Sequence, residues 1–257
     1  MDAVLQKIRR DRITLLVGIG LVAAIGWLVL ASMRIGMTGP EAAAAFMMRA
    51  RYSPSPGFAM VLAMWAAMMA AMMAPSAGPS SSAYLSLARC RHAEHGPTPA
   101  IAGFFTGYLA AWLGCAVLGA VAQWSLAEAR LLSPMGASVN AYLSAGILTA
   151  AGVYQLTPLK RACVARCRSP LLQLMSGWRD GTGGALRLGL GQGKWCVGCC
   201  WALMALLFVV GTMNLAWMAV LAAFVLTEKL VSARWHLDIA AGLVLLAWGS
   251  WLLAGAT

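Results

Sequence analysis

The chain alternates long apolar runs with short polar segments, and this pattern predicts most of its fold. Several runs exceed the roughly 18 residues that identify a membrane-crossing helix. The pattern therefore predicts an all-α, polytopic transmembrane helical bundle that forms a single domain over residues 1–257. About seven spans are expected, near residues 13–33, 57–75, 99–127, 138–157, 195–213, 216–233 and 237–255. Residues 158–194 are the longest polar stretch, and we expect them to form a basic loop.

Composition supports a membrane protein, because 61% of the residues are hydrophobic and 11% are charged. The formal net charge of +11 does not indicate nucleic-acid binding, since the basic residues cluster in loops between apolar runs. We therefore expect membrane lipids, and no nucleic acid, as partners. Protein partners in a membrane complex and the oligomeric state are left open.

The distribution of basic residues predicts the orientation. With a cytoplasmic N-terminus, 15 Lys and Arg residues lie inside and 4 lie outside. The positive-inside rule then predicts an N-in, C-out topology with the loop 158–194 in the cytoplasm. The Pro-opened, Ala-rich segment within residues 34–56 is expected to be a short amphipathic helix at the outer interface.

Methionine recurs at helical spacing in the second predicted span. Met60, Met64, Met68 and Met72 fall four residues apart, which places four thioethers along one stripe of a helix. Thioether sulfur is a soft, neutral ligand that suits Cu(I). The same stripe is equally well explained by packing, because methionine fills irregular gaps between helices. Met64, Met68 and Met72 are therefore candidate ligands, and both interpretations stay open.

Cysteine provides the second candidate chemistry. Cys163 and Cys167 are one helical turn apart, and the segment from Cys196 to Cys200 contains a C-x-x-C spacing that lets two thiolates bind one metal ion. At the expected cytoplasmic ends of spans these thiols face a reducing compartment, where structural disulfides are rare. The candidate metal ligands are Cys196, Cys199, Cys200, Cys163, Cys167 and Met204, together with the three methionines above.

The segment 158–194 joins the fourth and fifth predicted spans, which are antiparallel, so we expect the cysteines near their cytoplasmic ends to converge on one four-sulfur site. Cu(I), zinc and an iron–sulfur cluster all use such sites. Cu(I) is preferred because Met204 adds a thioether and no histidine is close in sequence. Packing remains an alternative for each motif alone, because cysteine is among the most commonly buried residues.

The other polar residues give weaker signals. Three histidines, none of them mid-span, exclude the imidazole sets of haem and di-iron membrane proteins. The segment from Cys90 to His95 is either a polar turn or a metal-collecting loop. Glu228 and Lys229 either mark an ion or proton path or anchor a helix at the interface, since carboxylates inside a membrane are costly. No catalytic residue is predicted, and whether the protein is an enzyme stays open.

Several separated motifs together resemble one known family. They are Met72-Met73-Ala-Pro75, the segment from Tyr154 to Pro170, the segment from Gly191 to Met204, Gly211 to Asn214, and Glu228-Lys229. The chain resembles a family of bacterial integral membrane proteins described as predicted metal-binding, with a domain of unknown function. The resemblance implies a metal and a location in the bacterial cytoplasmic (inner) membrane, and it supplies no mechanism.

Three classes of function are consistent with these patterns. The preferred class is a metal-handling membrane protein that binds, delivers or transports Cu(I) through Met and Cys ligands. The alternative is a membrane subunit of a larger oxidoreductase or assembly complex, in which the cysteines are redox-active or bind a cluster. The third is a scaffold in which alanines at four-residue spacing give close helix contacts.

Overall fold

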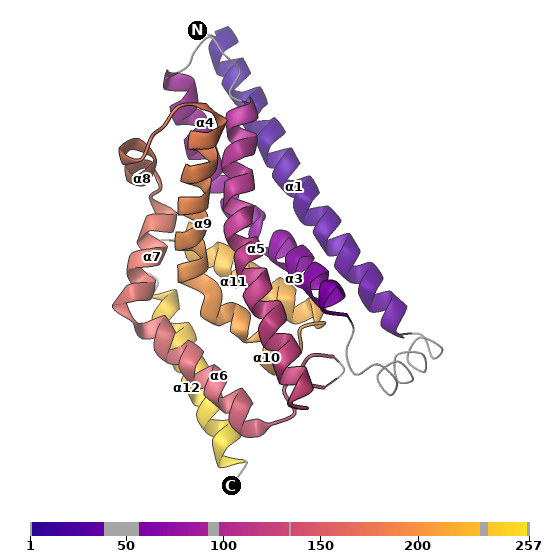
Figure 1. Cartoon of the computed structure of the whole chain (residues 1–257). Helices are drawn as coiled ribbons and strands as arrows, with labels where there is room; N and C mark the ends of the chain where they lie inside the picture. The colour runs from indigo at the N-terminus through magenta and orange to yellow at the C-terminus, as the bar shows by residue number, and fades with distance from the viewer. Residues whose placement is uncertain (1, 39–56, 92–97, 134, 232–235, 256–257) are drawn as a thin grey trace.

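The computed structural model describes residues 2–38, 57–91, 98–133, 135–231 and 236–255, and these fold almost entirely into helices (Figure 1). The helices are α1 (Asp2–Thr38), α3 (Phe58–Met73), the short 3-10 helix η1 (Pro75–Ala77), α4 (Gly78–Arg91), α5 (Thr98–Glu128), α6 (Ala141–Leu156), α7 (Pro158–Arg168), α8 (Leu171–Ser176), α9 (Gly181–Ala205), α10 (Leu207–Val210), α11 (Leu215–Leu230) and α12 (Leu237–Ala254). The predicted all-α fold class is thus confirmed. The expected amphipathic segment near residue 40 and the loop with His92 and His95 lie outside the described residues.

Four helical segments are long and apolar enough to cross a membrane: Arg9–Arg34, Pro99–Glu128, Gly181–Val210 and Leu237–Ala254. A fifth is the pair Phe58–Met73 and Pro75–Arg91, which is bent by 45° where the helix breaks. Helices α6 and α11 have 16 residues each, which span about 24 Å at about 1.5 Å per residue, less than a bilayer core. The count of seven spans therefore stays a prediction.

The first three passes of the chain run in alternating directions. Asp11 near the start of α1 forms an ion pair with Arg89 near the end of α4. Gly26 lies against Ala71 farther along α1, so α1 is antiparallel to α3 and α4. Helix α3 is in turn antiparallel to α5, because the ring of its first residue, Phe58, packs at 5.9 Å from that of Trp124 near the end of α5.

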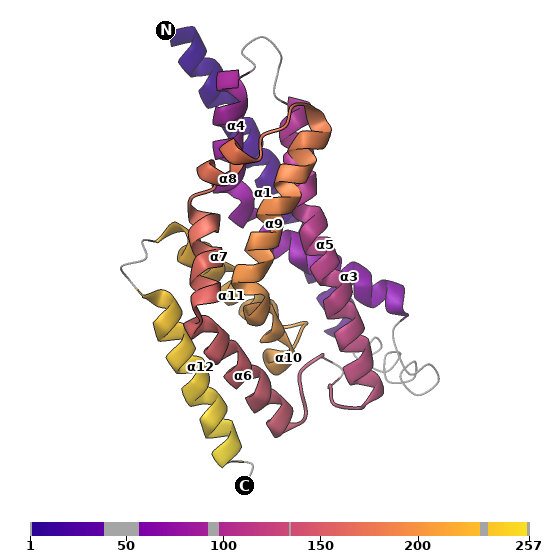
Figure 2. The same cartoon turned by 60° about the vertical axis from the view of Figure 1, so that its left-hand side comes forward.

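Helices α5 and α9, at the centre of the molecule, run parallel (Figures 1 and 2). Gly103 lies beside Ala185, and Gly193 is so close to α5 that a Cβ there would be 2.6 Å from the Cβ of Ala111. A parallel pair requires the chain to return between them, and α6, α7 and α8 make this return. Helix α12 packs beside α6 and ends at the opposite end of the molecule from the start of α1 (Figures 1 and 2).

The segment 158–194 differs from the expected loop, because most of it is helical. Pro158 ends α6 and opens α7, and the Thr157 side chain caps α7 by accepting from the backbone N–H of Lys160 at 3.3 Å. Helix α9 begins at Gly181, so Cys196 lies 15 residues inside it rather than in its first turn. This long helix forms because its glycines allow close contact with α5, which outweighs their low helix propensity.

Candidate metal centre

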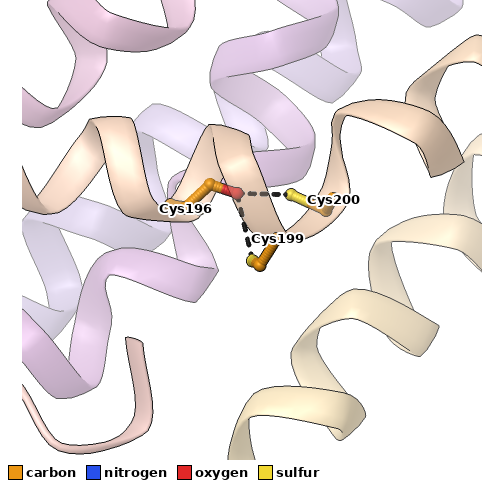
Figure 3. Close-up of side chains that lie close together, drawn as sticks. All are labelled: Cys196, Cys199 and Cys200. Carbon is orange, nitrogen blue, oxygen red and sulfur yellow. Dashed lines mark hydrogen bonds between the residues drawn. The ribbon is translucent and has the colours of Figure 1, made fainter. Parts of the chain in front are cut away.

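Three buried cysteines of α9 bring their sulfur atoms together. Cys196, Cys199 and Cys200 occupy positions i, i+3 and i+4, which share one face of a helix, and their sulfurs all lie within 4.8 Å of one another. Each of the three residues is at most 1% exposed. The thiols of Cys199 and Cys200 donate to the backbone carbonyl of Cys196 at 3.0 and 2.9 Å (Figure 3). Their orientation is therefore fixed by the helix itself.

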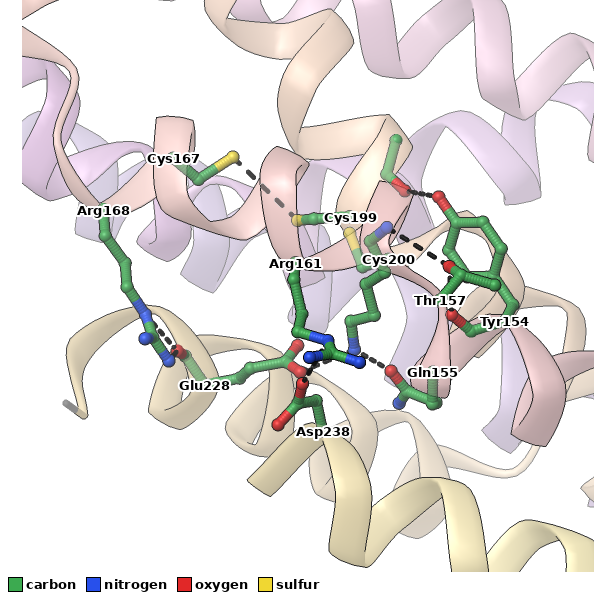
Figure 4. Close-up of polar contacts among 12 residues, drawn as sticks. Tyr154, Gln155, Thr157, Arg161, Cys167, Arg168, Cys199, Cys200, Glu228 and Asp238 are labelled. Carbon is green, nitrogen blue, oxygen red and sulfur yellow. Dashed lines mark hydrogen bonds and ion pairs between the residues drawn. The ribbon is translucent and has the colours of Figure 1, made fainter. Parts of the chain in front are cut away.

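Helix α7 adds two more sulfurs to this group. Cys167 points toward Cys199, and their sulfurs are 3.9 Å apart (Figure 4). Cys163 packs on the backbone of α9, where a Cβ at Gly198 would be 3.0 Å from its sulfur. The two cysteine motifs thus converge as the sequence predicted. We call Cys163, Cys167, Cys196, Cys199 and Cys200 the cysteine cluster.

A polar network closes the side of the cysteine cluster at Cys196. Lys229 Nζ of α11 donates to Cys196 Sγ at 2.7 Å and to Ser76 Oγ at 2.9 Å. Tyr108 OH of α5 lies 2.9 Å from the same sulfur and 2.8 Å from Ser76 Oγ. A buried ammonium group needs an anionic partner. The geometry therefore pairs Lys229 with a Cys196 thiolate.

The break between α3 and α4 supplies one member of this network. Pro75 interrupts the helix, and the backbone carbonyl of Met73 accepts from Ser76 Oγ at 2.9 Å and from Tyr108 OH at 3.3 Å. Met73 Sδ is 4.0 Å from Ser76 Oγ. Sequence reasoning missed Ser76, Tyr108 and Met73. The available signal was Pro75, which marks a helix break inside an apolar run.

A second buried charge pair fastens α7 to α11. Lys160 Nζ donates to Glu228 Oε1 at 2.5 Å and also to Gln155 Oε1 (Glu228 and Gln155 in Figure 4). The side chains of Lys160 and Glu228 are 0% and 3% exposed. Arg168 donates to the backbone carbonyl of Glu228 at 3.0 Å. Glu228 and Lys229 are both buried, so interpreting them as an interface anchor is wrong.

The remaining candidate ligands are four methionines, and all of them are buried. Met204, Met64, Met68 and Met72 are 2%, 3%, 0% and 2% exposed and belong to the same hydrophobic core as the cysteines, whereas Met60 is 54% exposed. Met64, Met68 and Met72 therefore face the interior, whereas Met60 does not. Asp238 lies away from the sulfurs, where it pairs at 3.8 Å with the exposed Arg161.

The sulfur spacing is compatible with coordination of one ion. Two sulfurs that bind one metal at about 2.3 Å are separated by about 3.8 Å in a tetrahedral arrangement and about 4.6 Å in a linear one. The 3.9 Å between Cys167 and Cys199 and the limit of 4.8 Å within the α9 triad fall in this range or close to it. Soft thiolates of this kind select Cu(I), zinc or iron–sulfur clusters.

These features define a helical protein with a buried, sulfur-rich candidate metal centre. A family model described as PpoB2, copper chaperone, matches residues 62–252, a range that includes the whole cysteine cluster. The match covers well over half of the chain, so the protein belongs to this copper chaperone family. Comparisons with curated proteins and with solved structures gave no match. The family supports the metal-related part of the resemblance noted in the sequence.

Proposed function

We propose that the protein is a membrane-embedded copper chaperone that binds one Cu(I) ion between the sulfurs of α9 and Cys167 of the cysteine cluster and passes it to a partner protein. One observation carries the proposal. In a member of a copper chaperone family, the sulfurs of three buried cysteines lie within 4.8 Å of one another. Copper is here the cargo rather than a resident cofactor.

Cys196, Cys199 and Cys200 are the ligands that we propose, with Cys167 as the fourth sulfur. Cu(I) is favoured over zinc by the soft, sulfur-rich surroundings, which include Met204 one turn beyond Cys200. Lys229 supports a monovalent ion as well, because Cu(I) bound by two thiolates, with the remaining sulfurs as neutral thiols, carries one net negative charge, which the ammonium group balances. Burial of the ion then leaves no net charge in a region of low dielectric constant.

The apolar helices support a position within a membrane, and the resemblance to bacterial membrane proteins supports the cytoplasmic membrane. The exposed surface of the outer helices carries large apolar side chains, such as Leu28 of α1, Leu118 of α5 and Trp251 of α12, which are each about 70% exposed. A soluble monomer rarely exposes so many. We propose that lipid covers them.

Titration of the purified protein in detergent with Cu(I), in competition with a chromophoric chelator, tests this function. The wild type is expected to bind one Cu(I), with an X-ray absorption spectrum typical of sulfur ligands. The triple variant C196S/C199S/C200S is expected to lose this tightly bound ion, because the serine oxygen is a hard ligand.

C90S is the matched control, because Cys90 is exposed and lies at the end of α4, outside the cysteine cluster. We expect it to bind Cu(I) like the wild type. Unchanged binding in the triple variant would contradict the proposal. Zinc or iron in place of copper in protein isolated from cells supplied with all three metals would contradict the assignment of the cargo.

A further inference from the structure

A cavity of about 540 Å³ lies between α9 and the bend that joins α6 to α7, directly beside the cysteine cluster. Its volume is in the range of small-molecule binding pockets. Trp195 and Trp201 of α9 and Leu159 of α7 form apolar walls. Leu159 and Trp201 are 61% and 48% exposed, so the cavity opens at the protein surface.

Cys163 is the cavity-lining residue that connects this space to the other sulfurs. It is 4% exposed and packs against Gly198, which also lines the cavity. Because Gly198 has no side chain, nothing separates Cys163 from the backbone of α9 at this point. One turn farther along α7, Cys167 is 3.9 Å from Cys199. Cys163 and Cys167, one turn apart on α7, therefore lie between the cavity and the buried triad.

The rim of the cavity is positively charged. Lys194 lines the cavity, and the guanidinium group of Arg166 stacks on the ring of Trp195 at 3.8 Å. Lys194 and Arg166 are both exposed. Exposed cations in a membrane protein face water or lipid headgroups rather than hydrocarbon. The positive rim therefore favours an anionic ligand that enters the cavity from the aqueous side.

From these observations we propose that Cys163 is a transfer ligand, which takes Cu(I) from an anionic bis(thiolate) complex of a small-molecule thiol that docks in this cavity. This inference rests on the proposed Cu(I) site and adds the form in which the cargo arrives. The small volume and basic rim of the cavity favour a small anionic carrier over a folded donor protein.

The transfer is a ligand exchange without a change of oxidation state. The sulfur of Cys163 forms a bond to Cu(I) while the bond to one carrier thiolate breaks, and the thiol proton of Cys163 goes to that departing thiolate. A thiol of the buried cluster then displaces the second carrier thiolate and gives it a proton in the same way. In the last step a second thiol of the cysteine cluster forms a bond to Cu(I) while the bond from Cys163 to Cu(I) breaks. The proton of that thiol goes to the sulfur of Cys163, and Cu(I) has moved inward.

Stopped-flow mixing of the full-length apoprotein in detergent with Cu(I)–glutathione tests the route, with the fluorescence of the cavity tryptophans as the signal. C163S is expected to slow transfer about tenfold or more, because the positioned first acceptor is lost. The Cu(I) stoichiometry and affinity at equilibrium are expected to stay at the wild-type values. L159W, which fills the opening and keeps every sulfur, is expected to slow transfer as well.

The charge of the carrier is tested with the double variant R166Q/K194Q. Loss of both rim cations is expected to slow transfer from Cu(I)–glutathione about tenfold at low salt and less at high salt. C90S serves as the control with an unchanged rate. An unchanged rate in both C163S and L159W would overturn the route, and loss of equilibrium binding in C163S would make Cys163 a permanent ligand instead. Failure of the wild type to bind Cu(I) at all would instead refute the proposed function itself.

Discussion

Lys229 is the residue whose position says most about the chemistry of the site. A charged side chain with 8% exposure is costly in a protein core unless it is paired. Its ammonium group donates to Cys196 Sγ and Ser76 Oγ, so the charge and two of its three N–H donors are used at the edge of the cysteine cluster. We infer that Lys229 balances the negative charge of the thiolates, with or without Cu(I).

Replacement of Lys229 by methionine is therefore expected to weaken Cu(I) binding. A hydrogen bond to a charged group contributes about 1.5–3 kcal/mol, which corresponds to roughly a 10- to 100-fold loss of affinity. Competition with a Cu(I) chelator measures this loss. C90S is the control, because Cys90 is exposed and lies outside the cysteine cluster. An unchanged affinity in K229M would show that the lysine has no part in holding the ion.

The methionine stripe of α3 allows a separate test at the residue scale. Met64, Met68 and Met72 are buried in the core, and replacement of all three by leucine conserves their volume. If they only pack, we expect each substitution to cost less than about 1.5 kcal/mol and Cu(I) binding to remain at one ion per chain. Denaturation in detergent and copper analysis give the two readouts. A loss of copper at unchanged stability would identify these thioethers as ligands.

The sequence indicated the sulfur atoms of the candidate site and singled out Lys229, but it missed two other polar neighbours of Cys196. Cys196, Cys199 and Cys200 are adjacent on one helix, so their spacing alone determines that they share a face. Ser76 and Tyr108 reach the same sulfur from 120 and 88 residues away. No local pattern encodes such contacts, because they depend on how η1 and α5 pack against α9.

At the scale of elements, α11 holds the site together through two adjacent residues. Lys229 contacts Cys196 of α9, while Glu228 pairs with Lys160 of α7. The first contact belongs to the polar network and the second fixes the helix that carries Cys163 and Cys167. Helix α11 therefore contacts both helices that carry the cysteine motifs.

Breaking the buried pair is expected to be far more damaging than breaking a surface pair. K160M leaves Glu228 buried without a cation and is expected to cost about 3–5 kcal/mol. D238N removes the partner of Arg161, which is 59% exposed, and is expected to cost less than about 1 kcal/mol. The double variant K160M/E228M is expected to recover much of the loss. Denaturant unfolding in detergent measures all three, and equal costs for K160M and D238N would refute the role of the pair.

The sequence predicted the existence of the helices better than their limits. Apolar runs identified the cores of α1, α3, α5, α6, α11 and α12, because burial in lipid or protein requires such runs. The sequence did not predict a helix in the first half of α9, because the five glycines from Gly183 to Gly193 are typical of a loop. These glycines allow close packing between helices, because a residue with a side chain could not lie as close to α5 as Gly193 does.

At the scale of the whole molecule, the directions of the helices bear on how often the chain crosses the membrane. Four candidate spans would place both termini on the same side, whereas an odd number places them on opposite sides. The start of α1 and the end of α12 lie at opposite ends of the molecule (Figure 1). The parallel packing of α5 and α9 also requires a return pass through α6 and α7. The positions of the termini favour an odd number of passes. When the bent pair α3–α4 and the return through α6 and α7 are counted with the four long spans, α11 is needed as the seventh pass.

We therefore expect an N-in, C-out topology, in which the start of α9 lies in the cytoplasm and the C-terminus lies outside. The 15 to 4 division of basic residues gives the orientation, because cytoplasmic segments retain Lys and Arg. Alkaline phosphatase fused after residue 257 is expected to be active, and the same enzyme fused after Arg179 is expected to be inactive. A green fluorescent protein at the same two sites is expected to give the opposite pattern. An inactive C-terminal phosphatase together with a fluorescent C-terminal fusion would mean an even number of passes. Phosphatase activity at Arg179 would place the cavity opening near Lys194 on the outer side, away from the cytoplasmic thiol pool.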